Sequence, residues 1–185
     1  MIKFVTGNRN KFAEAEAVLG FPIEQFDIDL PEVQSIDAHE IIRDKLSAAE
    51  KHAEGEYIVE DSSIYLDCLN SKLPGPLIKW FEEALGNEGI ALIADKFENR
   101  RAESRTLVGF SSKNGDVHFF EGVIRGSIVN PQGETSFGWD QIFIPEGSEK
   151  TFAEMTKEEK SKISSRAVAL TKLKNFIEEV SSEKR

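Results

Sequence analysis

The sequence predicts a mixed α/β protein built around one elongated β-sheet, and two observations support this. In the first half of the chain, short apolar strands alternate with amphipathic helices, a pattern typical of β-α-β units. In the second half, two long runs rich in Val, Ile and Phe are joined by Lys113-Asn114-Gly115-Asp116. This is a turn sequence, so the two runs are expected to form a hairpin.

The individual elements follow from local patterns along the chain. Strands are expected at residues 2–6, near 23–27, at 56–61, and in the hairpin at 104–112 and 117–129. Helices are expected at residues 10–20, from Asp37 through about 53, from Pro76 to just before Gly86, onward to about 97, and at 165–179. Gly20 ends the first helix, Asp37 and Glu40 begin the second as a capping box, and Pro76 begins the third. Gly86 lies just past the end of the third helix.

Length and composition favour one ordinary globular domain over residues 1–185, without internal repeats. No stretch approaches the roughly 18 apolar residues of a membrane helix. The start of the chain does not read as a signal peptide. One cysteine, Cys68, excludes an internal disulfide and suits a reducing cytoplasm. The net charge of −10 argues against nucleic-acid polymers but allows a small anionic ligand.

The segment FVTGNRNKF, residues 4–12, predicts an anion site. An apolar strand runs into Gly7 and Asn8, and a helix follows at once. Backbone N–H groups at a helix N-terminus bind phosphates, Asn8 can cap the helix, and Lys11 adds a positive charge. The pattern is weak alone, because many turns contain Gly and Asn.

Two cations lie on apolar helix faces. Lys45 falls within the stripe formed by Ile41, Ile42 and Leu46, so it either extends to the surface or faces an anion in a cleft. Arg166 lies in the first turn of the last helix, where a cation opposes the helix dipole. Either a ligand or a structural carboxylate would offset that cost, with Ser164 as the N-cap.

The strand 56–61 ends in two acids, of which Asp61 is a candidate for metal chemistry. Glu60 and Asp61 are adjacent and so face opposite sides of the sheet, which places at most one of them in a given site. Glu32, in a Leu-Pro-Glu turn, could supply a second oxygen. Mg²⁺ is commonly held by one or two carboxylates together with substrate phosphates. Surface charge remains the alternative for both Glu32 and Asp61.

Taken together and in order, these stretches resemble the inosine triphosphate pyrophosphatase family, the XTP/dITP diphosphatases. The resemblance covers nearly the whole chain and is closest to the archaeal and eukaryotic branch. It rests on TGNRNK (6–11), DLPEVQ (29–34), Glu40 to Lys45, VEDSS (59–63), LPGPLIKWF (73–81), FGWDQIF (137–143), TFAEMTKEEK (151–160) and SSR (164–166).

The resemblance implies hydrolysis of nucleoside triphosphates, chiefly the deaminated purines ITP, dITP and XTP, to the monophosphate and pyrophosphate with Mg²⁺. It further implies a homodimer and a mixed α/β fold of two lobes with the nucleotide in a cleft between them. The matching residues for the triphosphate are Thr6, Gly7, Asn8, Lys11 and Lys45, with Ser62 and Lys79 also contacting substrate. Glu32 and Asp61 match the magnesium ligands, and Asp61 also matches the catalytic base. In the pocket for the nucleotide base, Phe137 would stack on the purine. The residues that line this pocket would be Gly138, Trp139 and Asp140, and those that complete it Lys160, Ser165 and Arg166.

Periodicity gives a different interpretation for one of these residues. Lys79 lies opposite Leu77, Phe81 and Leu85, which predicts a solvated side chain.

One position departs from the family pattern. Most relatives have Ser-His-Arg where this chain has Ser164-Ser165-Arg166, and the histidine helps to recognise the purine 6-oxo group. A milder departure is Gln141, where relatives often have Pro. A shorter hydroxyl discriminates less strictly, so a broadened or shifted base preference stays open. A nucleotide-binding sensor without turnover is the alternative from another class.

Overall fold

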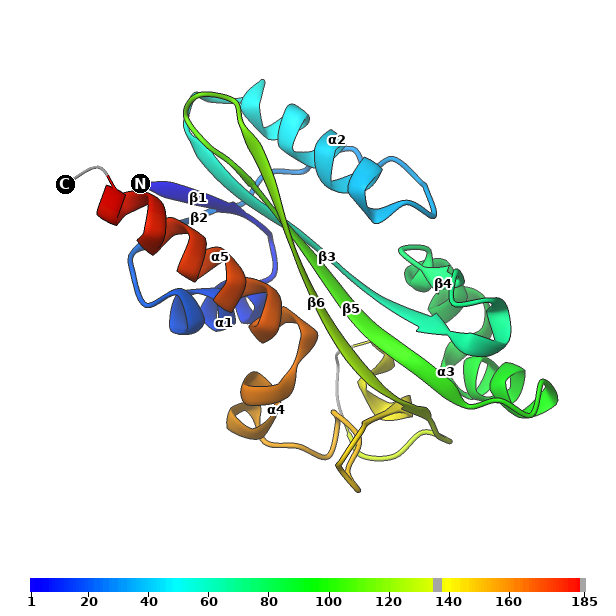
Figure 1. Ribbon diagram of the computed structural model, residues 1–185. Coiled ribbons are helices and arrows are strands. Elements are labelled where there is room, and N and C mark those ends of the chain that lie inside the picture. The colour runs from blue at the N-terminus through cyan, green and yellow to red at the C-terminus, as the bar shows by residue number, and fades with distance from the viewer. Residues whose placement is uncertain (135–137, 184–185) are drawn as a thin grey trace. The chain divides into compact units, whose positions relative to one another are not determined.

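The structure is a computed structural model and describes residues 1–134 and 138–183 (Figure 1). In this part of the chain, seven strands form one sheet in the order β2-β1-β3-β5-β6-β7, with β4 paired to β3. The strands are β1 Ile2–Val5, β2 Ile23–Phe26, β3 Glu56–Leu66, β4 Pro74–Gly75, β5 Arg101–Ser111, β6 Val117–Ile128 and β7 Phe143–Pro145. The helices are α1 Arg9–Leu19, α2 Ala38–Glu50, α3 Ile78–Lys96, α4 Lys157–Ile163 and α5 Ser165–Glu183, with 3-10 turns at Asp67–Leu69 and Gly138–Ile142. The predicted mixed α/β class is confirmed.

The chain divides into two compact units. The first comprises Met1–Asp61, Thr106–Gly122 and Ser165–Arg185, and the second comprises Ser62–Arg105 and Val123–Ser164. Strands β3, β5 and β6 contribute residues to both units, so each unit is assembled from segments far apart in sequence. A cleft between two lobes and a single functional domain stay predictions.

The first unit has three layers. Strand β1 pairs in parallel with both β2 and β3. Ile58 of β3 packs in a core with residues of α1 and α5, whereas its neighbours Tyr57 and Val59 pack in a second core with residues of α2. Figure 1 shows α2 on one side of these strands and α1 with α5 on the other. Because side chains alternate along a strand, Glu60 faces α1 and α5 with Ile58, and Asp61 faces α2 with Val59.

The second unit has its own apolar core. Ile64 and Leu66 of β3 pack there with residues of α3 and with Phe143 and Phe152. Helix α3 is interrupted at Gly86, whose φ of 65° and ψ of 177° are not helical. The kink separates two helical segments, as the glycine predicted. No helix in the described residues is long and apolar enough to span a membrane.

Several local predictions are confirmed at the level of caps and turns. Asp37 is the N-cap of α2 and accepts the His39 N–H at 2.9 Å. The predicted capping box is wrong, because Glu40 accepts the Ser35 hydroxyl at 2.6 Å and the Asp37 N–H donates to Ser35 Oγ. Gly20 ends α1 in the left-handed conformation, with a φ of 71°. The hairpin turn closes with the Ser112 N–H donating to the Asp116 carbonyl at 3.0 Å.

Several predicted boundaries are wrong, among them the start of β5, which lies at Arg101 instead of residue 104. Helix α3 begins at Ile78, two residues after Pro76, and Leu77 is its N-cap. Strand β3 continues to Leu66 instead of ending at Asp61. The polar pair Ser62-Ser63 interrupts the apolar run in the sequence. Strand β3 nevertheless remains paired beyond it, with Ile64 opposite Gly75 of β4.

Candidate active site

The loop between β1 and α1 is held in place by its own side chains. Asn8 is the N-cap of α1, as predicted, and its Oδ1 accepts the N–H groups of Asn10 at 2.9 Å and Lys11 at 3.2 Å. The Asn8 N–H donates to Thr6 Oγ1 at 3.1 Å. These two N–H groups at the start of α1 therefore bond to the Asn8 side chain in this structure. Because they are occupied, binding of an anion here depends more on the Lys11 ammonium.

A cavity of about 560 Å³ in the first unit lies beside this loop. Its volume falls in the range of small-molecule sites. Its lining includes six of the residues predicted for the triphosphate and the metal, which are Thr6, Gly7, Asn8, Lys11, Glu32 and Lys45. Segments far apart in sequence thus meet at one place, as the predicted constellation requires.

Lys45 lies between two carboxylates. Its Nζ is 2.7 Å from Glu32 Oε1 and 3.9 Å from Asp61 Oδ1, and it also donates to the Glu60 carbonyl at 3.4 Å. The Lys45 side chain is 13% exposed and that of Asp61 is 17% exposed. Of the two readings of Lys45, the structure supports an ammonium that faces anions at a cavity. A cation already bridges the two acids predicted to bind metal.

The donor set fits Mg²⁺. Mg²⁺ prefers carboxylate oxygens and takes few of them from the protein when substrate phosphates complete its shell. No group of three or more potential metal ligands occurs among the described residues. Glu32 and Asp61, drawn to one common cation, would hold the ion if the Lys45 ammonium moved aside.

On the opposite face of β3, Glu60 is the centre of a buried ionic network. Its carboxylate accepts Arg166 Nε at 3.1 and 2.9 Å and lies 3.0 Å from Lys11 Nζ. Arg166 Nη1 also contacts Glu14 Oε2 at 2.6 Å. Burial alone would raise the pKa of Glu60, but the charges of Arg166 and Lys11 outweigh it and lower this pKa to about 2.

The same network gives Arg166 two carboxylate partners. The side chain is 5% exposed and pairs with Glu60 and Glu14, so its position has a structural carboxylate partner, as the alternative reading proposed. Burial opposes its charge, but the two acids raise the pKa of the guanidinium further above its usual value. Contact of Arg166 with a base or a phosphate stays a prediction.

Ser165, the residue that departs from the family pattern, is also engaged. It is buried at the start of α5, and its Oγ lies 2.9 Å from Thr106 Oγ1 of β5 in a buried hydroxyl pair. Ser164 precedes it and is the C-cap of α4, with φ −73° and ψ 150° and its N–H donating to the Lys160 carbonyl. Its role as the N-cap of α5 stays a prediction. The hydroxyl at this position therefore has a protein partner within the first unit.

The remaining predicted residues belong to the second unit, apart from Phe137, which lies outside the described residues. Ser62 follows Asp61 on β3. Lys79 is 74% exposed and 4.0 Å from Glu83, as its helical periodicity predicted. Gly138, Trp139 and Asp140 lie in one 3-10 turn, and Lys160 Nζ pairs with Asp140 Oδ2.

Trp139 packs into the core of the second unit. It is 6% exposed, and its ring meets that of Phe143 edge to face at 5.8 Å. Asp140 is more buried still, at 3% exposed. Glu82 of α3 lies near this turn, and burial, followed by repulsion from Asp140, raises its pKa.

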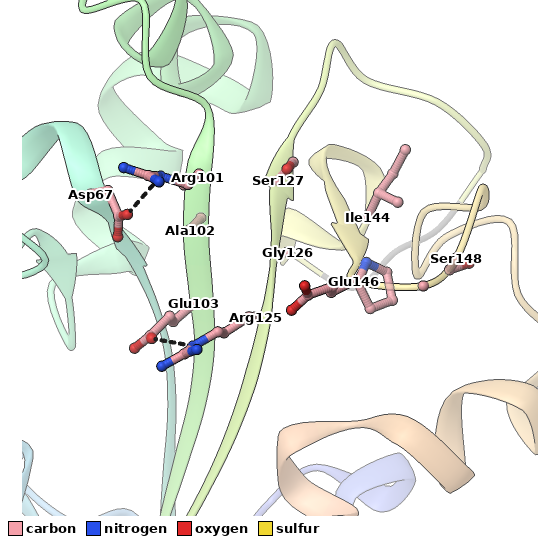
Figure 2. Close-up of a pocket in the computed structure, with 12 residues that line it drawn as sticks. Asp67, Arg101, Ala102, Glu103, Arg125, Gly126, Ser127, Ile144, Glu146 and Ser148 are labelled. Atoms are coloured by element: carbon pink, nitrogen blue, oxygen red, sulfur yellow. Dashed lines mark hydrogen bonds and ion pairs between the residues drawn. The ribbon is translucent and has the colours of Figure 1, made fainter.

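A second cavity, of about 630 Å³, contains none of the predicted site residues (Figure 2). It lies in the second unit, between the ends of β5 and β6 and the strand β7. Figure 2 shows its two arginines paired with acids, Arg101 with Asp67 and Arg125 with Glu103. Chemistry is more readily assigned to the smaller cavity, where lysines and carboxylates from four segments meet.

Sequence reasoning missed three contributors to the first unit. Glu60 was recognised as one of an acid pair but given no role, and Glu14 and Thr106 were not singled out. The only available signal was the charged Glu60 at the end of a buried strand. The contacts of Glu14 and Thr106 join residues more than fifty positions apart, which periodicity does not report.

The protein is a mixed α/β protein with a cavity that lysines and carboxylates line. The sequence model of the Ham1 family matches residues 2–176, and the chain belongs to this family. The inosine triphosphate pyrophosphatase of Schizosaccharomyces pombe is 38% identical over 180 residues, covering 96% of this chain and 95% of the relative. That of Emericella nidulans is 43% identical over 179 residues, covering 95% and 96%. The dITP/XTP pyrophosphatase of Methanopyrus kandleri is 42% identical over 173 residues, covering 91% and 92%.

Solved structures agree with this assignment. The Ham1 protein of Staphylococcus aureus superposes with a TM-score of 0.82 at 26% identity, covering 96% of this chain and 98% of the other. A nucleoside-triphosphatase, dITP/XTP pyrophosphatase, of Mycobacterium abscessus superposes with a TM-score of 0.70 at 29% identity, covering 94% and 98%. The family resemblance drawn from the sequence motifs is therefore confirmed.

Proposed function

We propose that this protein hydrolyses nucleoside triphosphates, chiefly ITP, dITP and XTP, to the nucleoside monophosphate and pyrophosphate, and so removes deaminated purines from the nucleotide pool. The observation that supports this most directly is the cavity of the first unit. A capped loop with Lys11 lies there beside Lys45 and Glu32, and Asp61 Oδ1 lies 3.9 Å from Lys45 Nζ. The names of the relatives point to the same reaction.

The reaction needs charge neutralisation and positioning more than covalent help from the protein. Lys11 and Lys45 would bind the phosphate oxygens, and Glu32 and Asp61 would hold Mg²⁺. When bound, Mg²⁺ would neutralise phosphate charge and stabilise the leaving pyrophosphate. Asp61 would orient a water molecule and accept its proton as the water oxygen bonds to phosphorus. The phosphoanhydride bond then breaks, and pyrophosphate departs.

The base preference has a second candidate. The Ser165 hydroxyl pairs with Thr106 Oγ1. This contact directs the hydroxyl to the protein and not to the purine base that a histidine would recognise at this position. This observation favours a broader or shifted base preference within the same reaction. We further propose a homodimer located in the cytoplasm, as the resemblance and the single cysteine suggest. A nucleotide-binding sensor would share the cavity but show no Mg²⁺-dependent turnover.

The substitution Asp61→Asn tests the catalytic proposal. We expect pyrophosphate release from ITP to fall by about 100-fold or more, the usual contribution of a general base, while binding of the nucleotide largely survives. Pyrophosphate release and calorimetric nucleotide binding measure the two effects separately. Asp116→Asn in the hairpin turn makes the same charge change at an exposed position and is the control. Equal loss of binding and turnover in Asp61→Asn would contradict the role of catalytic base and leave Asp61 only a metal-binding or folding role.

A further inference from the structure

Glu60 has no role in the proposed chemistry, yet it is the most completely buried acid of the network. Its side chain is 2% exposed, and it lines the same cavity as Lys11 and Lys45. A buried carboxylate is costly unless cations and hydrogen bonds compensate it. Glu60 has both, because Arg166 donates Nε to its two oxygens and Lys11 approaches Oε1.

Both lysines assigned to phosphate contact this one residue. The Glu60 carboxylate is 3.0 Å from Lys11 Nζ on one face of β3, and its backbone carbonyl accepts Lys45 Nζ at 3.4 Å. Lysine has a flexible four-carbon stem, and an ammonium without a fixed partner samples many rotamers. Glu60 restricts the ammonium of Lys11 to one place beside the loop Thr6–Asn8.

The charges around Glu60 leave the Lys11 ammonium available to bind an anion. Arg166 lies on both oxygens of Glu60 and is itself buried, so it balances the carboxylate charge. Lys11 is the second cation on the same acid, and its side chain remains 24% exposed toward the cavity. Arg166 also has its own second acid, Glu14. A purely structural Glu60 would need Arg166 alone.

We propose that Glu60 is a positioning residue that orders the Lys11 ammonium for the polyphosphate of the substrate. This inference rests on the proposed function. Glu60 acts through Lys11 and does not touch the reacting atoms. Its effect must therefore depend on the presence of Lys11 and on the number of phosphates in the ligand.

The test compares the substitutions Glu60→Gln and Glu60→Asp with Glu14→Gln. Glu14→Gln removes the other acid on Arg166 and leaves the contact between Glu60 and Lys11 in place. Calorimetry measures binding of IMP and of an ITP analogue with a methylene bridge between the α and β phosphates, and thermal unfolding measures stability. We expect Glu60→Gln to weaken the triphosphate analogue by about tenfold, the value of one hydrogen bond to a charged group. IMP binding should change less, and Glu14→Gln should leave the ratio between the two ligands unchanged.

Glu60→Asp covers the case in which Glu60→Gln does not fold. It keeps a negative charge for Arg166 but withdraws the carboxylate from Lys11, so it should lose triphosphate affinity with a smaller loss of stability. Each of the two Glu60 substitutions is also combined with Lys11→Met. Because Glu60 and Lys11 act as one unit, the affinity of each double variant for the triphosphate analogue should lie within about twofold of that of Lys11→Met alone.

Two results would overturn the inference. One is an equal loss for IMP and the triphosphate analogue. The other is a full loss that persists in the Lys11→Met background. Failure of the proposed function is distinguishable from both, because it would appear as absent binding and turnover of ITP in the unmodified protein.

Discussion

Lys45→Met should make the protein bind divalent metal more tightly while it turns over substrate more slowly. In the structure, the Lys45 ammonium bridges the carboxylates of Glu32 and Asp61, at 2.7 and 3.9 Å, where the metal is expected. A metal ion must therefore displace it. Exposed ion pairs contribute about 0.2–1 kcal/mol each, so the two together account for about 0.4–2 kcal/mol. Metal affinity should then rise by roughly 2–30-fold, at 1.4 kcal/mol for each factor of ten.

Electron paramagnetic resonance of Mn²⁺, without nucleotide, measures this affinity directly. Lys150→Met serves as the control, because it removes the same charge from an exposed lysine paired with Glu159. Pyrophosphate release should fall in Lys45→Met, since the same ammonium is assigned to phosphate. Unchanged or weaker Mn²⁺ binding in a folded Lys45→Met protein would refute the metal position inferred from the ion pairs.

Two further predictions concern stability. A Cβ on Gly122 would lie 1.9 Å from the Ser165 carbonyl oxygen, so Gly122→Ala must displace the start of α5. We expect a loss of about 1–3 kcal/mol, typical of overpacking, together with slower ITP turnover; unchanged thermal unfolding would contradict this. The second prediction concerns the loss of stability at low pH. The pKa of Glu60 is lowered from its ordinary value of 4.5 to about 2 in the folded protein. The stabilisation that ionised Glu60 contributes to the fold is therefore complete above pH 4.5 and is lost as the pH falls from there toward 2. Urea unfolding should show this slope, and Glu60→Gln should flatten it; equal slopes in both proteins would contradict the assignment.

The sequence predicted features that depend on local periodicity and capping. Asn8 and Asp37 cap their helices because each supplies a side-chain acceptor just before an amphipathic run. Lys45 was notable because a cation stood in an apolar stripe, and the structure places it at the cavity. Lys79 is exposed on the helix face that periodicity assigned to solvent.

Features that depend on long-range pairing were not predictable. Alternation along β3 indicated that Glu60 and Asp61 face opposite sides, but nothing local showed that cations would meet both of them. The partners of Glu60 come from α1 and α5, and that of Asp61 comes from α2. Likewise, the hydroxyl pair of Ser165 with Thr106 joins positions 59 residues apart. Such contacts are set by the order of strands and helices in three dimensions.

The most direct test of the proposed function is pyrophosphate release with Mg²⁺, measured side by side for ITP, XTP, dITP, GTP, ATP and the pyrimidine triphosphates. We predict Mg²⁺-dependent release with a strong preference for ITP, XTP and dITP. Comparable release from all of these nucleotides would contradict the preference for deaminated purines and support the broader specificity suggested by Ser165. Absence of release from every nucleotide, with binding retained, would contradict the enzymatic assignment and favour a nucleotide-binding sensor.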